Sequence, residues 1–274
     1  MKSEDPSAQR QSEAERRQQI IEYWNAERLC SLESSTSHAH PDVAFLDNAI
    51  ENRMLGSILS KYAKEEGRRC LDVGAGYGRF TPTFRRYYEQ VILLEGASSI
   101  YDRLYDLWGR TPGVKCVSDT FEDFTDRNQH AYDLLFASGV LYLYDDAMVR
   151  RFMSDARRIG SQQQLLILRD FIAEPARTME SAYVRGGHCY YRSRDFWKRV
   201  ASDCGFALLE VVRSKPKLAL IRHPRFLRAA EALGLSRAFR SNTAANLSYR
   251  WGDWGLQPRA IETAYIVVEA VSQR

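Results

Sequence analysis

The sequence is poor in cysteine, and its cysteines do not form the close pairs that bind metals. Its 274 residues include five cysteines, none in a C-x-x-C pair: Cys30, Cys70, Cys116, Cys189 and Cys204. This spacing argues against a structural zinc site and against a disulfide framework. Cys70 and Cys116 lie in apolar runs, where a buried thiol is expected. We therefore expect a cytoplasmic protein that binds no metal.

Long hydrophobic runs and a strong charge of one sign are also missing. No apolar run approaches the roughly 20 residues that a transmembrane helix needs. Residues 1–19 are too polar for a secretory signal. The net charge is only +4 and the basic residues are dispersed, which does not by itself indicate nucleic-acid binding. We expect neither a membrane nor a nucleic acid as a partner.

The composition is that of a globular protein with a sizeable core. Hydrophobic residues make up 45% of the chain and charged residues 27%, and the length suits one domain with an appendage. Residues 1–12 are rich in Ser, Gln and charge, which predicts a disordered tail. Residues 13–64 carry two helical patterns, which we expect to form a lid. Residues 65–274 form the main domain, with an insert at about 213–262 as part of the substrate wall.

Three glycines at alternate positions follow the first strand-like run. The run Cys70–Val73 leads into Gly74, Gly76 and Gly78, and a helix-compatible segment follows from about Arg79. Glycine accepts the positive φ of a tight turn and lets a ligand approach bare backbone. The helix N-terminus then presents free N–H groups and partial positive charge to that ligand. The pattern predicts a strand, a tight turn and a helix that together bind a nucleotide.

Two acids indicate which nucleotide the turn fits. Asp72 stands just before the turn, where a carboxylate would repel the pyrophosphate of a dinucleotide but suits an ammonium and a sulfonium group. The second apolar run, Val91–Leu94, ends in Glu95, which is placed to accept hydrogen bonds from ribose hydroxyls. The alternative is a glycine-rich turn in another doubly wound sheet, above all that of a nicotinamide-dependent dehydrogenase.

The rest of the pattern alternates strands with helices. The strand runs are almost continuously apolar, as expected for strands buried on both faces, and helices of about ten residues separate them. We predict an α/β fold with a doubly wound, mostly parallel sheet of seven strands. We expect the strands at 70–73, 91–95, 114–117, 132–137, 164–168, 206–212 and 263–270, and the helices at 13–29, 41–62, from about 79, 98–108, 145–159 and 193–204.

These motifs together resemble the class I S-adenosylmethionine-dependent methyltransferases. Their first motif is an acid-x-Gly-x-Gly-x-Gly turn, here Asp72 to Gly78, and their second is an acid that ends the next strand, here Glu95. The resemblance covers about residues 65–212 and the last strand. It implies a Rossmann-like methyltransferase fold with S-adenosyl-L-methionine as cofactor. The long insert before the last strand departs from the family, in which the last two strands usually form a hairpin.

The resemblance also implies which residues contact the cofactor. Asp72 and the turn would line its methionine part, and Glu95 its ribose. Asp119 would face the adenine amino group, with Thr120 and Phe121 beside the base, and the end of the fourth strand would pass under the sulfonium. Asp119 is alternatively an ordinary helix N-cap, and Phe121 a core residue. The full set is Asp72, Gly74, Ala75, Gly76, Glu95, Gly96, Asp119, Thr120, Phe121, Ser138 and Gly139.

Polar and aromatic residues near the same sheet edge are candidates for the acceptor site. Methyl transfer needs a base only where the acceptor carries a proton, and the candidate catalytic residues are His188, Asp170 and Tyr142. Aromatic rings could attract a cationic acceptor. His188 is alternatively an exposed loop histidine, and the tyrosines ordinary packing residues. The candidate substrate contacts are Tyr142, Tyr190, Tyr191, Trp251 and Trp254.

Two methyltransferase subfamilies match these motifs to different degrees. Metal-dependent catechol-type methyltransferases use an Asp after the fourth strand and an Asp-Asn pair after the fifth, whereas this chain has Ser138-Gly139 and Asp170-Phe171, so no metal site is expected. Protein N-terminal amine methyltransferases are more similar. The resemblance rests on the turn from Leu71 to Arg79, the Arg169-Asp170 step, the Arg192-Ser193 helix start and the N-terminal pair Tyr23-Trp24. The His that this subfamily has after the fourth strand aligns near Leu143, and the Asn that follows its basic-Asp pair is Phe171 here. The peptide activity therefore does not follow from the resemblance.

We therefore expect an enzyme that transfers a methyl group to an oxygen or nitrogen of a small biosynthetic molecule. The enlarged segments 169–192 and 213–262 favour an enclosed aromatic pocket. The alternative acceptor is a peptide or protein N-terminal amine, for which the same segments would form an open groove. A non-catalytic cofactor-binding scaffold is a remote alternative, because the chain keeps Asp72, the glycines and Glu95. The Asn-Pro-Pro-Tyr step of many base methyltransferases is absent.

Overall fold

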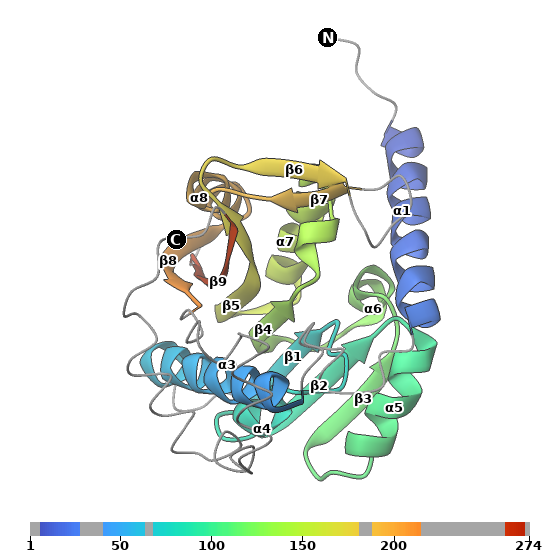
Figure 1. Ribbon diagram of the computed structural model, residues 1–274, viewed down its shortest axis with the longest axis vertical. Helices are drawn as coiled ribbons and strands as arrows, with labels where there is room; N and C mark the ends of the chain where they lie inside the picture. Colours follow the sequence, from blue (N-terminus) through green and yellow to red (C-terminus); the bar gives the residue numbers. More distant parts are fainter. Residues whose placement is uncertain (1–5, 28–40, 64–67, 181–187, 215–260, 272–274) are drawn as a thin grey trace, which may run out of the picture.

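A seven-stranded sheet with the order β3-β2-β1-β4-β5-β9-β8 forms the centre of the molecule (Figure 1). The computed structural model describes residues 6–27, 41–63, 68–180, 188–214 and 261–271. The first five strands pair in parallel, and β9 is antiparallel to β5 and β8, which confirms the doubly wound, mostly parallel sheet. The strands are β1 (Arg69–Val73), β2 (Gln90–Glu95), β3 (Val114–Ser118), β4 (Tyr132–Ser138), β5 (Gly160–Ala173), β8 (Phe206–Arg213) and β9 (Ile261–Ala270).

The strand order reverses between β1 and β4. Following the chain from β1 leads to β2 and β3 on one side, whereas β4 and β5 lie on the other. At the carboxyl ends of the central pair, Asp72 lies opposite Phe136 and Val73 opposite Ala137. Ligands of open α/β sheets bind outside the carboxyl ends of the strands at such a point. The topology therefore places the glycine turn after β1 beside the segment that follows β4.

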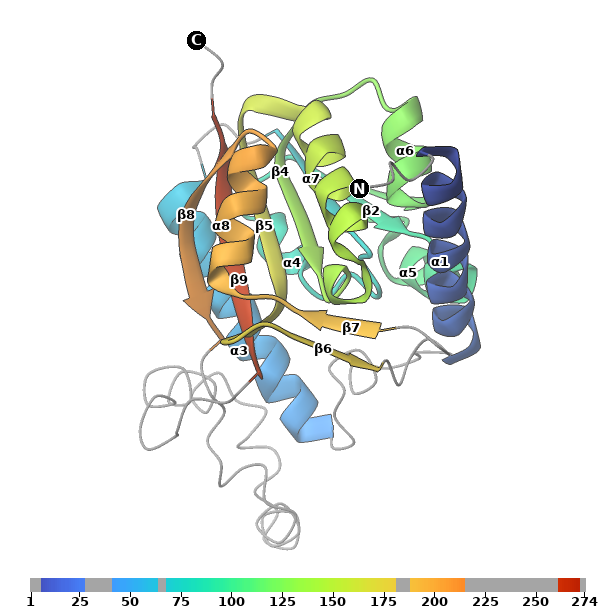
Figure 2. The same ribbon diagram turned by 90° about the horizontal axis from the view of Figure 1, so that it is seen from above.

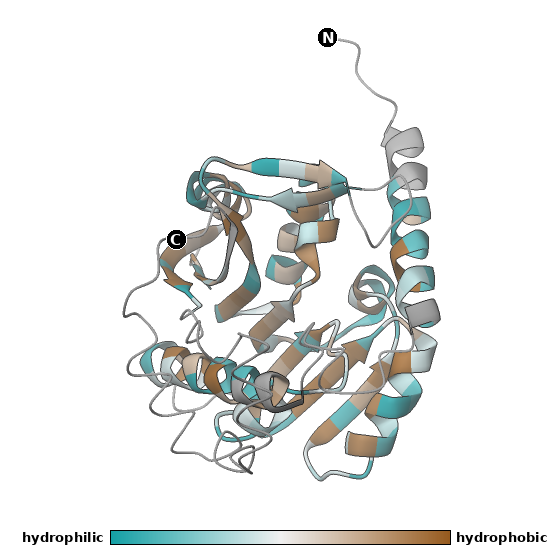
Figure 3. Ribbon diagram, viewed as in Figure 1, coloured by the Kyte–Doolittle hydropathy of each residue, from teal (hydrophilic) through white to brown (hydrophobic). Residues whose placement is uncertain are grey.

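Helices cover both faces of this sheet (Figure 2). One face carries α3, α4 and α5, whose apolar side chains form one buried cluster with the strands, and the other carries α6, α7 and α8 over a second cluster. Hydrophobic residues accordingly concentrate in the strands (Figure 3). The helices are α3 (Pro41–Tyr62), α4 (Thr81–Phe84), α5 (Ser98–Trp108), α6 (Phe121–Arg127), α7 (Asp146–Arg158) and α8 (Arg194–Asp203).

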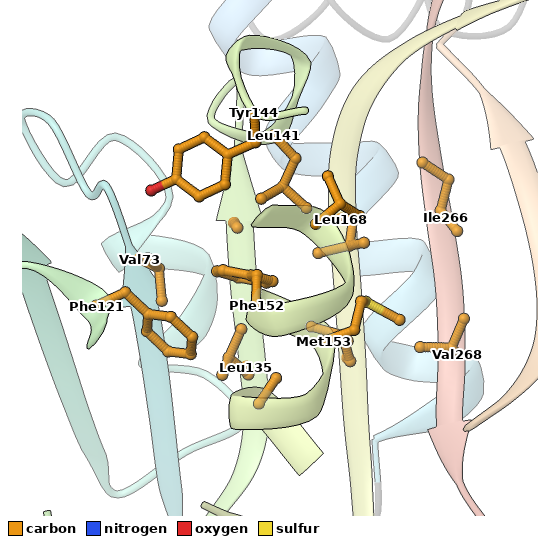
Figure 4. Packing of buried hydrophobic residues seen from close by; sticks show 14 of the residues in the cluster. Val73, Phe121, Leu135, Leu141, Tyr144, Phe152, Met153, Leu168, Ile266 and Val268 are labelled. Atoms are coloured by element: carbon orange, nitrogen blue, oxygen red, sulfur yellow. The ribbon is translucent and has the colours of Figure 1, made fainter. Parts of the chain in front are cut away.

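Helix α7 shows how the sequence specifies one of these layers. Asp145 caps its N-terminus, accepting a hydrogen bond from the Met148 N–H at 2.9 Å, and two arginines occupy its last turn, where they complement the helix dipole. Phe152 and Met153, about one turn after Met148, point into the core against Leu135 and other strand residues (Figure 4). Burial of this apolar stripe, rather than helix propensity, holds α7 on the sheet.

The structure departs from the predicted elements mainly in the second half of the chain. Strand β5 runs from Gly160 to Ala173, well beyond the predicted 164–168, because its end pairs with the start of β9. Such long-range pairing leaves no local pattern in the sequence. A hairpin of β6 (Arg177–Glu180) and β7 (His188–Tyr191) was not predicted. Helix α4 is shorter than expected, and residues 215–260 of the predicted insert lie outside the described residues.

The two N-terminal helices take different positions. Helix α3 packs on the sheet through Met54, Leu55 and Leu59, so it belongs to a helical layer and not to a lid. Helix α1 (Pro6–Glu27) runs past the carboxyl ends of the strands, from α5 toward the β6–β7 hairpin (Figures 1 and 2). It begins at Pro6, earlier than the predicted Glu13, so residues 6–12 are helical where a disordered tail was expected.

Within the described ranges, no helix is long and apolar enough to cross a membrane. The same ranges contain no group of three or more His, Cys, Asp or Glu side chains that could hold a metal ion. Four of the five cysteines are described, and each is a free thiol: Cys70, Cys116, Cys189 and Cys204.

Candidate functional site

The glycine turn after β1 has the conformation that its sequence predicts. Gly74 and Gly76 have φ of +64° and +57°, in the left-handed region that glycine adopts without strain. A Cβ on Gly74 would lie 2.7 Å from Cγ2 of Val140, so only glycine fits this contact with the segment after β4. A Cβ on Gly76 would meet none of the described atoms within 4 Å. The backbone at Gly76 is therefore open to a ligand.

Glu95, the last residue of β2, holds this turn together with the next loop. Its Oε2 accepts the N–H of Gly76 at 2.9 Å and its Oε1 accepts the N–H of Ala97 at 2.9 Å. Burial raises the pKa of Glu95, and the backbone hydrogen bonds from Ala97, Gly76 and Gly96 oppose that effect. Each carboxylate oxygen can accept a further hydrogen bond. Glu95 thus has the acceptors that ribose hydroxyls would require.

Asp72 is a buried acid directly before the turn. Its side chain is 2% exposed, and its Oδ2 accepts no hydrogen bond from the described residues. Burial raises the pKa of Asp72 well above its usual range; the positive charge of Arg79 lowers it, and the negative charge of Glu95 raises it further. A positively charged ligand would relieve this arrangement, because it would favour the ionised form of both acids.

The loop after β3 carries the predicted adenine contacts Asp119, Thr120 and Phe121. Asp119 forms an ion pair with Arg127, and the N-cap of α6 is Thr120, not Asp119. Phe121 is buried, with its ring centroid 4.5 Å from that of Phe152. Its ring is therefore used in the core, which was the alternative interpretation of this residue. Asp119 and Thr120 remain half-buried beside Gly96, at the same edge as Glu95.

A buried charge network fixes the end of β4. Arg169 on β5 binds this segment twice. Its backbone carbonyl accepts the N–H of Gly139 at 2.9 Å, and Nη1 of its side chain donates to Ser138 Oγ at 3.3 Å. The same guanidinium pairs with Glu51 of α3, whose other oxygen lies 2.5 Å from Nη1 of Arg79. Burial would raise the pKa of Glu51, but the two guanidiniums together lower it to about 2. Helix α3 is thus tied to the turn and to β5.

Asp170, next along β5, is a second buried carboxyl group. It is 2% exposed; its Oδ1 accepts the N–H of Phe171 at 2.8 Å, while its Oδ2 accepts no hydrogen bond from the described residues. Burial raises the pKa of Asp170 to about 7, although the Phe171 N–H and the charges of Arg192 and Arg169 act to lower it. Near neutral pH this carboxyl group can therefore either hold or release a proton.

Phe171, the residue after Asp170 on β5, belongs to an aromatic group. The ring of Phe171 meets those of Tyr142 and Tyr191 edge to face, with centroid distances of 5.1 and 6.0 Å. These rings come from three elements: β5, β7 and η1, the 3₁₀ turn Leu141–Leu143 that follows β4. The structure thereby brings together two of the tyrosines that the sequence analysis proposed as substrate contacts.

The remaining acceptor-site candidates lie elsewhere or outside the described residues. His188 is exposed at the start of β7, where its ring centroid is 6.3 Å from that of Tyr190. The ring of Tyr190 lies between the guanidiniums of Arg16 and Arg192, at 5.3 and 5.2 Å. These contacts favour a packing role for Tyr190. Trp251 and Trp254 lie outside the described residues.

Comparison with known protein families identifies this arrangement. A family model described as a methyltransferase domain matches residues 48–211, more than half of the chain. The chain belongs to the class I S-adenosylmethionine-dependent methyltransferases. This family membership confirms the resemblance drawn from the glycine turn and the two acids. No curated protein matches this chain at a significant level.

Solved structures of other methyltransferases have the same fold at low sequence identity. A SAM-dependent methyltransferase from Leishmania major is 13% identical with a TM-score of 0.60, over 90% of this chain and 81% of that one. Magnesium protoporphyrin IX methyltransferase from Synechocystis, solved with bound SAM, is 10% identical with a TM-score of 0.57, over 92% and 95%. A cyclopropane synthase from Mycobacterium tuberculosis is 13% identical with a TM-score of 0.53, over 83% of each chain.

The residues at the turn fit S-adenosylmethionine, the cofactor of this family. Gly76 leaves room beside bare backbone, Asp72 offers an unpartnered buried oxygen to a cationic group, and Glu95 offers acceptors to hydroxyls. The pyrophosphate of a dinucleotide would instead meet the buried acid Asp72. These observations support the predicted cofactor residues of β1 and β2 more strongly than those after β3.

Sequence reasoning missed the residues that tie these elements together. Glu51 shares the inward face of α3 with Leu55 and Ile58, at the i, i+4 and i+7 spacing. An acid on an apolar face signals a buried ion pair, which would have identified it. Arg192 has no comparable signal, because its partners are backbone carbonyls and a distant aspartate.

Proposed function

We propose that this methyltransferase transfers a methyl group from S-adenosylmethionine to a nitrogen or oxygen of a small-molecule acceptor, with Asp170 as the base. The observation that carries the proposal is the carboxyl group of Asp170, buried at the carboxyl end of β5 with one oxygen unpartnered among the described residues. The bound cofactor supplies an electrophilic methyl group. The protein has to hold the acceptor, exclude water and accept any proton that the acceptor loses.

The protonation of Asp170 suits this role. Its pKa of about 7 lies near the pH at which a cytoplasmic enzyme works, where general-base catalysis is most effective. The sequence analysis left three candidates for the base: His188, Asp170 and Tyr142. His188 is exposed, whereas Asp170 is buried and directly precedes Phe171, whose ring meets that of Tyr142. We therefore assign the role of base to Asp170 and that of acceptor contact to Tyr142.

The elements around Asp170 favour a small acceptor. Arg16 of α1 donates to the carbonyl of Leu143 at 3.0 Å and to that of His188 at 3.1 Å, which holds α1 against η1 and β7. Ile21 of the same helix lies close to Gly96, at the predicted ribose site. Helix α1 thus covers the edge of the sheet between the predicted cofactor and acceptor positions, an arrangement that supports an enclosed site.

A peptide N-terminal amine is the alternative acceptor. The edge-to-face pair Tyr23–Trp24 in α1 and the Arg169-Asp170 step support it, because both belong to the resemblance to N-terminal amine methyltransferases. Leu143, which is buried, and Phe171 replace the His and Asn of that subfamily. Some solved structures with this fold are named for small acceptors, among them magnesium protoporphyrin IX, which supports the first proposal.

One experiment separates these acceptors. Purified protein is incubated with radiolabelled S-adenosylmethionine and a cell extract divided into small-molecule and peptide fractions. We expect label in the small-molecule fraction, and label confined to peptides would contradict the proposal.

The same assay tests Asp170 once labelled acceptor is found. Asp170→Asn should reduce transfer at least about 100-fold, the lower range for loss of a general base, without weakening binding of S-adenosylhomocysteine. Asp102→Asn, on the exposed side of α5, is the matched control and should be fully active. Transfer by Asp170→Asn at the natural rate would rule out Asp170 as the base.

A further inference from the structure

Arg192, between β7 and α8, is a buried guanidinium that the proposed reaction does not use directly. The residue is 3% exposed. Its Nε donates to Oδ1 of Asp146 at 3.0 Å, its Nη1 to the carbonyl of Leu141 at 2.9 Å, and its Nη2 to the carbonyl of Tyr144. One side chain therefore binds α7 and both ends of η1. A planar fork with five donors can do this, and a lysine ammonium cannot.

The segment that Arg192 holds connects the two halves of the site. Val140, directly before η1, touches the position where Gly74 would carry a Cβ, and Tyr142 lies within η1. The backbone bonds of η1 itself are few: the N–H of Leu143 to the carbonyl of Val140 at 3.3 Å, and the N–H of Tyr144 to that of Leu141 at 3.1 Å. The conformation of this short turn depends on side chains that bind its carbonyls.

The backbone of Arg192 is joined to the end of β5. Its carbonyl accepts the N–H of Ala173 at 3.1 Å, and it forms an isolated bridge with Ile172. The guanidinium also packs against the rings of Phe196 and Trp197, at 5.0 and 5.9 Å from the ring centroids. Arg192 therefore has a fixed position relative to both β5 and η1.

Arg192 also contributes to the electrostatic environment of Asp170. The charged groups that act on this carboxyl are Arg192 and Arg169, and Glu51 of α3 neutralises part of the Arg169 charge. Asp146 of α7 pairs with Arg192, but its side chain is 62% exposed, so water screens its charge. The positive charge of Arg192 favours the ionised form of Asp170.

We propose that Arg192 is a positioning residue for methyl transfer, which holds η1 and Tyr142 against the end of β5. The same fixed guanidinium acts on Asp170 through its positive charge. This role rests on the proposed function of Asp170. Among the residues that the structure describes, neither the glycine turn nor Glu95 is a hydrogen-bond, ion-pair or ring partner of Arg192, so its loss should leave cofactor binding intact.

Hydrogen exchange tests the mechanical part without an acceptor. Arg192→Lys keeps the charge but cannot reach all three partners. We expect exchange in residues 139–145 to become about tenfold faster, as in local opening of a weakly held segment, with β4 unchanged. Arg150→Lys is the matched control, since Arg150 is a half-exposed arginine of α7 that pairs with Asp203. Unchanged exchange in Arg192→Lys would overturn the proposal.

Titration of the carboxyl group tests the electrostatic part. The pKa of Asp170 is measured by ¹³C NMR of protein labelled at aspartate Cγ, with Asp170→Asn to assign the signal. Arg192→Met should raise this pKa and Arg192→Lys should leave it close to that of the natural chain. A residue needed only for folding would not separate the two variants. Equal pKa values in both variants would overturn this part.

If the Arg192 variants fail to fold, a milder variant tests the role of Arg192. Asp146→Asn removes one exposed partner of the guanidinium and should speed exchange in residues 139–145 by about two- to fivefold; no change would count against the proposal. Exchange and titration need no acceptor. Failure of Asp170→Asn to reduce methyl transfer would reject the proposed function while leaving these readouts to decide the role of Arg192 on their own.

Discussion

The proposed base, Asp170, predicts a pH dependence of methyl transfer that its burial determines. A base must be ionised to accept a proton, so the rate of transfer should fall about tenfold per pH unit below the pKa of about 7 and level off above it. The pH profile of kcat/KM measures this, because it reports the pKa of the free enzyme. A flat profile between pH 5 and 8 would show that the reaction needs no base in this range, as for an acceptor without a transferable proton.

The raised pKa of Asp170 also predicts how the stability of the fold changes with pH. The folded-state pKa of Asp170 is raised, so its stabilising contribution is complete below the unfolded pKa of about 3.9 and is lost as the pH rises through about 7. Asp170→Asn removes this loss. Relative to the natural chain, it should gain about 2–3 kcal/mol more stability at pH 8 than at pH 5, measured by urea unfolding. An equal effect at both pH values would contradict the raised pKa.

The carboxylate of Glu95 binds two backbone N–H groups beside the predicted ribose site. Glu95→Ala leaves the N–H groups of Gly76 and Ala97 without their acceptor. We expect weaker binding of S-adenosylhomocysteine by about 1.5–3 kcal/mol, the range for hydrogen bonds to a charged group. Calorimetric titration measures it, with Glu89→Ala, an exposed residue before β2, as the control. Equal affinities of the two variants would remove Glu95 from the ribose site.

At the residue scale, the sequence was most informative where backbone and charge decide the chemistry. Gly74 and Gly76 could be predicted because both have a positive φ, and a Cβ on Gly74 would also collide with Val140. Glu95 could be predicted because a buried strand seldom ends in an acid without a partner. Phe121 could not be placed, because an aromatic ring suits both a base-stacking position and the core. Its packing against Phe152 depends on where α7 lies, which no local pattern specifies.

At the scale of elements, α3 is joined to the site by charge as well as by apolar packing. Glu51→Gln would leave Arg79 and Arg169 buried with only a neutral partner. Breaking a buried pair in this way costs about 3–5 kcal/mol of stability. The folded-state pKa of Glu51 is lowered to about 2, so its contribution is present above the unfolded pKa and is lost as the pH falls from about 4.5 toward 2.

Urea unfolding at pH 7 measures the loss in Glu51→Gln. The control is Lys61→Met, which removes the exposed partner of Glu210 near the end of the same helix and should have a much smaller effect. If both variants are equally stable, α3 is held by its apolar face alone. The element boundaries themselves were predictable here, since α3 spans Pro41–Tyr62 as expected, whereas its ion pairs depend on the tertiary structure.

Elements with a strong local period were predicted well, and those defined by distant partners were not. Helix α5 runs from Ser98 to Trp108 as its amphipathic pattern indicates. The β6–β7 hairpin is exposed along β6 and has no alternating apolar pattern there, so the sequence left it irregular. The extension of β5 exists because β9, about 100 residues later in the chain, pairs with it up to Ala173.

At the scale of the whole molecule, the predicted cofactor contacts come from the ends of several strands that adjoin one another in the sheet. A ligand that binds β1, β2 and the segment after β4 together should therefore stabilise the entire sheet. S-adenosylhomocysteine at 100 times its dissociation constant should stabilise the fold by about 2.7 kcal/mol, which for a chain of this size is a rise in Tm of roughly 5–11 °C. A nicotinamide dinucleotide should give no rise, because the buried acid Asp72 opposes its pyrophosphate.

Thermal unfolding with each ligand distinguishes the two nucleotide classes that the glycine turn alone leaves open. Asp72→Asn serves as the diagnostic variant, because it removes the buried negative charge and keeps the shape of the side chain. Its stability without ligand should rise, since no buried acid then has to ionise, while its gain from S-adenosylhomocysteine should shrink. A variant in which the gain is undiminished would show that the charge of Asp72 does not act on the cofactor, and that the turn selects its ligand by shape.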